Sequence, residues 1–107
     1  MLLYLDLDLH LAPPGSHKCD FGESVSRGEC EARGKVFMPN GPGGIAIGSG
    51  GSCLDVGWGQ VPLGCSLQNA STSGAKPHYK TSGDTGKGCI GNAYQLICKV
   101  SGTLFRA

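Results

Sequence analysis

Six cysteines are the residues of this chain whose type and number most constrain its chemistry. They are Cys19, Cys30, Cys53, Cys65, Cys89 and Cys98, and no two of them form a C-x-x-C pair. An even number of cysteines without metal-ligand or redox spacing predicts disulfides, here three, and an oxidising extracellular compartment. We expect the pairs to be Cys65 with Cys89, Cys30 with Cys53 and Cys19 with Cys98. The alternative is that all six stay reduced and act as small core hydrophobes.

The three histidines are the remaining candidates for metal or acid–base chemistry. His10, His17 and His78 are the only histidines, and none has metal-ligand spacing to another. No nucleophile elbow surrounds the serines, and paired cysteines leave no free thiol as a nucleophile. We therefore expect no catalytic residue, no metal site and no cofactor, and we expect that the protein is not an enzyme.

Three residues are candidates for sugar chemistry. Asn69 begins an Asn-Ala-Ser tripeptide in a loop rich in serine, threonine and glycine, which predicts N-glycosylation. Trp58 lies between two glycines, where its ring could stack on a sugar, and Tyr79 could extend that surface. Two alternatives stay open: an unmodified polar loop at Asn69, and a core position for Trp58 against the disulfides.

Length and charge narrow the class of protein. The chain has 107 residues, enough for one domain, and its net charge of +1 gives no reason to expect nucleic acid or an acidic membrane surface. No run approaches the roughly 18 apolar residues of a membrane span. Asp6 and Asp8 interrupt the apolar start, which also lacks a basic region, so we expect a mature end or a fragment boundary there and no signal peptide.

The elements that must position these residues begin with an arm at residues 1–12. Its leucines alternate with other residue types, which predicts a strand with one leucine face. That face consists of Leu3, Leu5, Leu7, Leu9 and Leu11. A Pro-Pro-Gly sequence at 13–15 then ends the strand and begins a linker at 13–18. Because the rest of the chain is poor in leucine, we expect the arm to pack on a sheet, either its own or that of a neighbouring copy.

The cysteine-rich module at 19–107 is predicted to be mainly β. The predicted strands are 35–38, 64–68, 78–81 and 93–100, chosen for their β-branched, aromatic or alternating residues. A short helix is expected within 24–34, with Ser26 as N-cap and Gly34 as its stop. The predicted fold is a small antiparallel β module with long glycine-rich loops, held by disulfides.

The stretch from Cys53 to Cys98 contains Pro-x-Gly-Cys, then an aromatic residue after histidine, then Tyr-x-Leu-x-Cys. The positions are Pro62, Gly64, Cys65, His78, Tyr79, Cys89, Tyr94, Leu96 and Cys98. This pattern resembles small cysteine-rich extracellular modules in secreted proteins of algae and other protists. The resemblance covers less than half of the chain. It implies an extracellular eukaryotic module and assigns no activity, ligand or functional residue.

These observations predict two alternative functions. The first is an extracellular structural or adhesive module that forms oligomers or fibres by donating its arm to a neighbouring subunit. The second is a secreted carbohydrate-binding module that uses Trp58 and Tyr79. The partner is a second copy in the first case and a glycan in the second, without nucleic acid or a membrane span.

Overall fold

The computed structural model describes the whole chain except residues 1, 42, 53–56, 69–75, 84–92 and 107, with the backbone alone for 2–8 and 101–106. In chain order the elements are β1 (Leu2–Leu11), β2 (Glu23–Ser24), α1 (Arg27–Phe37), β3 (Ala46–Gly48), the 3-10 turn η1 (Trp58–Gln60), β4 (Gly64–Gln68), β5 (Pro77–Lys80) and β6 (Tyr94–Arg106). The predicted fold class is confirmed: the described part is a small, mainly β, disulfide-bonded module with one helix.

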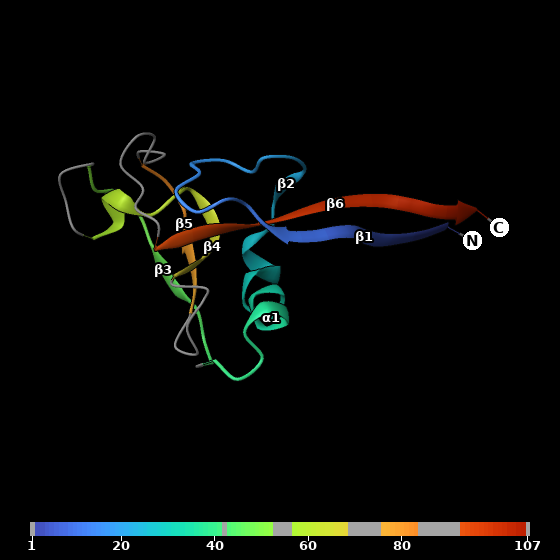
Figure 1. The fold of residues 1–107 in the computed structure, drawn as a ribbon, viewed down its shortest axis with the longest axis horizontal. Coiled ribbons are helices and arrows are strands. Elements are labelled where there is room, and N and C mark those ends of the chain that lie inside the picture. The colour runs from blue at the N-terminus through green and yellow to red at the C-terminus, as the bar shows by residue number, and fades with distance from the viewer. Residues whose placement is uncertain (1, 42, 53–56, 69–75, 84–92, 107) are drawn as a thin grey trace.

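A six-stranded sheet organises the chain, with the order β1-β6-β4-β5-β3 and with β2 beside β6. β6 pairs antiparallel with β1 along one edge, and with β4 and then β2 along the other. Beyond Lys99, β1 is the only neighbour of β6 in the described part of the chain. Figure 1 shows these two strands leaving the body together, with both chain ends at the far tip. We call this two-stranded extension, residues 2–8 and 100–106, the ribbon.

The first face of the sheet is covered by α1. The core between them contains Val25, Cys30, Cys65, Leu67 and Ile97. Leu9 and Leu11, at the inner end of β1, pack against this core and are partly buried. The arm is thus part of the module's own packing.

The opposite face of the sheet is covered by the segment that follows β1. Cys19 in this segment is bonded to Cys98 in β6, and Ala12 and Leu96 are buried with Cys98. The backbone N–H of Ala12 donates to the carbonyl of Leu96 at 2.9 Å. The chain therefore stays in contact with β6 after β1 has ended.

Of the three predicted disulfides, one is right and two are wrong. The bridges are Cys19–Cys98, as predicted, and Cys30–Cys65, which excludes both Cys30–Cys53 and Cys65–Cys89. Packing of α1 on β4 brings the Cα atoms of Cys30 and Cys65 to 5.6 Å, a distance that sequence spacing does not reveal. Cys53 and Cys89 lie outside the described residues.

Two predictions about local elements are also wrong. The helix begins after Ser26, as predicted, but it continues past Gly34 to Phe37, so the first three residues of the strand predicted at 35–38 are helical and Met38 is the C-cap. Gly34 is buried, and a Cβ there would lie 2.6 Å from Cγ of Pro77 in β5. Glycine at this position permits close packing of the helix on the sheet and does not end the helix. The sequence also missed β3, which pairs parallel with β5.

Replacing Gly34 by alanine is expected to destabilise the protein, because the added methyl group would collide with the rigid Pro77 ring. Overpacking costs about 1–3 kcal/mol, against a gain in helix propensity of about 1 kcal/mol. Gly28→Ala is the matched control, since nothing lies within 4 Å of its added methyl group and the melting temperature should rise. Thermal unfolding followed by circular dichroism measures both. A Gly34→Ala variant as stable as Gly28→Ala would contradict the packing argument.

Candidate functional site

The arm predicted as the assembly strand forms β1, and it pairs with the chain's own β6. The register runs from Leu2 opposite Arg106 to Leu11 opposite Ile97, with two bulges along the way. Of the predicted leucine face, Leu9 and Leu11 reach the core. The other members, Leu3, Leu5 and Leu7, lie in the part of β1 whose backbone alone is described.

The ribbon is the feature of the fold that depends least on the rest of the sheet. At about 3.4 Å per residue, its seven residues on β6 extend roughly 24 Å beyond the last pairing with β2. An isolated two-stranded ribbon is marginally stable in water. Its position therefore depends on the contacts at its root, where β1 and β6 enter the body at residues 9–11 and 97–99.

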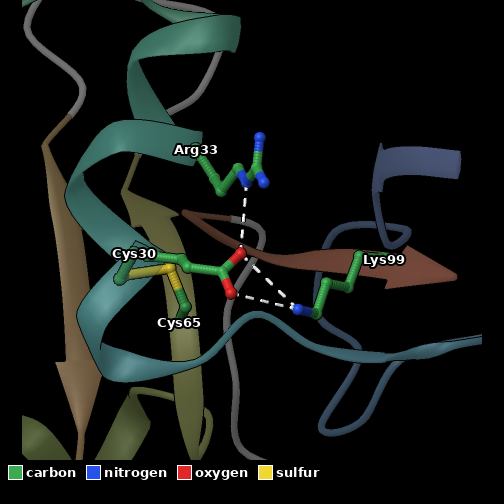
Figure 2. A network of polar contacts seen from close by, with 5 residues as sticks. Cys30, Arg33, Cys65 and Lys99 are labelled. Carbon is green, nitrogen blue, oxygen red and sulfur yellow. Dashed lines mark hydrogen bonds and ion pairs between the residues drawn. A yellow bond between two sulfur atoms is a disulfide. The ribbon is translucent and has the colours of Figure 1, made fainter. Parts of the chain in front are cut away.

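On the helix face, the root is held by charges. Lys99 Nζ donates to Glu29 Oε1 at 3.2 Å and to Oε2 at 3.5 Å. Arg33 Nε, one turn along α1, donates to the same carboxylate at 3.3 Å. Figure 2 shows the two basic side chains converging on this carboxylate beside the Cys30–Cys65 bridge. The hydrogen bond from Lys99, with a smaller contribution from Arg33, lowers the pKa of Glu29.

On the opposite face, the root is held by a disulfide, a histidine and a stacked ring. His10 lies opposite Cys98 in the register of β1 and β6. Its Nε2 is 2.7 Å from Asp20 Oδ1, and its ring stacks on Phe21 with centroids 4.0 Å apart. The hydrogen bond with His10 lowers the pKa of Asp20. The Cys19–Cys98 bridge therefore sits beside an acid–histidine pair.

This cluster does not have the chemistry of a metal site. A nitrogen of His10, a carboxylate oxygen of Asp20 and Cys98 Sγ lie within 4.8 Å of one another. Cys98 is bonded to Cys19, however, so its sulfur cannot act as a thiolate ligand. The sequence analysis did not connect His10 with Asp20 or Cys98, because only the pairing of β1 with β6 brings these residues together.

The structure separates the two candidate sugar-binding aromatics. Trp58 is partly buried, with its ring close over Gly48 and its centroid 5.6 Å from that of His78. The rings of His78 and Tyr94 meet edge to face, also with centroids 5.6 Å apart. Burial lowers the pKa of His78 and raises that of Tyr94. Tyr79 packs on the core under α1, which is the other face of the sheet because neighbouring strand residues alternate.

Asn69, the predicted glycosylation site, lies outside the described residues. Comparison of the chain with protein-family models, with curated proteins and with solved structures found no match. In the described part of the chain, no helix has the length and apolar character needed to cross a membrane.

Replacing Glu29 by glutamine should weaken the root in a pH-dependent way. Because folding lowers the pKa of Glu29, its stabilising effect is present above the unfolded-state pKa and disappears as the pH falls through the folded-state pKa. The pair is partly exposed, so the loss at neutral pH is about 0.2–1 kcal/mol. Urea unfolding at neutral and strongly acidic pH measures the difference from wild type, which should vanish in acid.

Glu23→Gln is the matched control for this measurement. The carboxylate of Glu23 is exposed and makes no ion pair or hydrogen bond within the described part of the chain. Its replacement should leave the unfolding free energy unchanged at both pH values. An equal loss in the two variants would mean that the Glu29 contacts do not hold the root.

Proposed function

We propose that this protein is an extracellular structural module that self-associates by exchanging β1 between copies. The observation that carries the proposal is the position of the arm: β1 hydrogen-bonds to one strand alone among the described elements, at the end of the sheet, yet supplies side chains to the core. Disulfides are compatible with the extracellular location that the proposal needs.

The core contacts of the arm define the place that an exchanged strand would occupy. Leu9 and Leu11 pack against the cluster formed by Val25, Cys30, Cys65, Leu67 and Ile97. Burying a leucine side chain is worth about 1.5–3 kcal/mol, so a module whose arm has left is destabilised. The arm of a second copy would restore the same contacts in the same register, and exchange therefore needs no new interface.

The ribbon favours exchange over simple edge-to-edge pairing of two copies. Asp6 and Asp8 lie on β1, and acidic residues on an edge strand oppose pairing with an identical edge, since like charges would meet. In exchange, each β1 still pairs with a β6. The Pro-Pro-Gly segment at 13–15 lies between the arm and the Cys19–Cys98 bridge and would serve as the hinge.

The test is the molar mass of the full chain across a wide concentration range, measured by light scattering after size exclusion. Exchange predicts oligomers whose population rises with concentration.

Deleting residues 1–12 should leave a less stable monomer, and adding a synthetic peptide of residues 1–12 should raise its melting temperature. The matched control is the same peptide with Leu9→Lys and Leu11→Lys, which should have no effect because it cannot fill the core.

Two outcomes would contradict the proposal. A full chain that stays monomeric at every concentration would exclude self-association. A deletion variant that is destabilised but leaves the oligomer intact would place the interface elsewhere and not on β1.

A second candidate function, carbohydrate binding, is favoured by the partly exposed Trp58, whose ring contacts that of His78. Rings that present an apolar face can stack on a sugar. The surface differs from the one predicted, because Tyr79 lies on the opposite face of the sheet.

Trp58 is the only tryptophan, so its fluorescence reports on this surface directly. If the surface binds sugars, soluble oligosaccharides should shift the emission and protect the indole from iodide quenching. Trp58→Ala should abolish retention on a glycan matrix, whereas the control Tyr79→Phe should keep it. An indole that iodide cannot quench at all would exclude this candidate.

A further inference from the structure

A pocket of about 480 Å³ opens beside the Cys19–Cys98 bridge. It is lined by His17, Lys18, Cys19, Gly22, Glu23, Ser24, Leu63 and Leu96. Cys19 is partly exposed, whereas Cys98 is completely buried. A small molecule in the pocket would therefore meet the Cys19 end of the bridge and not the Cys98 end.

The positive charge of the pocket next to Cys19 favours binding of an anionic small molecule. The exposed Lys18 precedes Cys19 in the chain, and His17 adds a second nitrogen base to the lining. The leucines supply an apolar wall. Glu23 is the one acidic residue among the lining side chains. A thiolate approaching Cys19 would be attracted by the lysine charge.

The other end of the bridge has a group that can stabilise a departing thiolate. A nitrogen of His10 and a carboxylate oxygen of Asp20 lie within 4.8 Å of Cys98 Sγ. Asp20, 2.7 Å from His10 Nε2, holds the imidazole ring in place. A histidine nitrogen beside a cysteine sulfur can donate a hydrogen bond to the departing thiolate and so makes it a better leaving group.

We propose that the Cys19–Cys98 bridge is a site of thiol–disulfide exchange with small anionic thiols. The incoming thiolate attacks Cys19 Sγ and forms a new S–S bond, the Cys19–Cys98 bond breaks, and its electron pair goes to Cys98 Sγ. The Cys98 thiolate forms beside His10 and then takes up a proton from solvent. A second thiolate attacks the sulfur of the first thiol, which releases Cys19 as a thiolate. The protein disulfide is then reduced by two electrons, and two small thiols are oxidised to one disulfide.

The second bridge provides an internal control within the same molecule. Cys30 on α1 and Cys65 on β4 are both completely buried between the helix and the sheet (Figure 2). A thiolate cannot reach either sulfur without opening the helix. Exchange at the native fold should therefore be selective, whereas reduction through unfolding would open both bridges together.

The experiment treats the oxidised full chain with reduced glutathione, an anionic thiol, at neutral pH and without denaturant. Samples are quenched in acid, alkylated and mapped by peptide mass. Cys19–Cys98 should open roughly tenfold faster than Cys30–Cys65, and the mixed disulfide should form on Cys19. Cysteamine, a cationic thiol, should react more slowly than glutathione once both rates are corrected for thiolate concentration.

Three variants separate a chemical role from a structural one. His10→Gln should slow opening of Cys19–Cys98 with either thiol, whereas a change that merely loosened the fold would speed the opening of both bridges. Lys18→Gln should slow the reaction with glutathione alone. The control is Lys35→Gln, which removes an exposed charge at the end of α1, far from the pocket in sequence and outside its lining. Equal rates at the two bridges, an adduct on Cys98, or an unchanged rate in His10→Gln would overturn the proposal.

Discussion

The pairing of β6 is the constraint on which the rest of the structure depends. Along residues 94–99 this strand has β4 or β2 on one edge and β1 or the segment after it on the other, and beyond them β1 is its one neighbour among the described residues. The change coincides with the root, where Lys99 is paired with Glu29 on one face and Cys98 is bonded to Cys19 on the other. β6 thus changes within one or two residues from a strand paired on both edges to half of a marginally stable two-stranded ribbon. The contacts at the root determine how much of that ribbon stays paired.

Features with a local cause could be predicted from the sequence. β4 has the predicted bounds, and β1 follows the alternating leucines almost to their end. Ser26 precedes the helix although its side chain makes no capping hydrogen bond, so an extended backbone at that position is enough. Features that depend on packing could not be predicted. Gly34 looked like a helix stop because its role depends on Pro77, more than forty residues away.

The same distinction applies to the candidate site. The leucine face could be recognised from spacing, but the strand opposite it could not, because register depends on β6 and on two bulges. His10 and Asp20 meet only after β1 has paired and the following segment has turned back across the sheet. Trp58 and Tyr79 were grouped as aromatics, yet the two-residue period of a strand puts Tyr79 on the face away from His78 and thus from Trp58.

The Cys19–Cys98 bridge also determines how this protein would respond to mechanical load. The bond joins residues 79 positions apart, so everything between them forms one covalent ring, and the arm and the far part of β6 are the two tails outside it. Both tails end at the same tip (Figure 1). Tension applied there would peel β1 from β6 one hydrogen-bonded pair at a time and then reach the sulfur–sulfur bond. The ring would carry almost none of the force, so a module pulled by its ends could lengthen and recover while its core stayed folded.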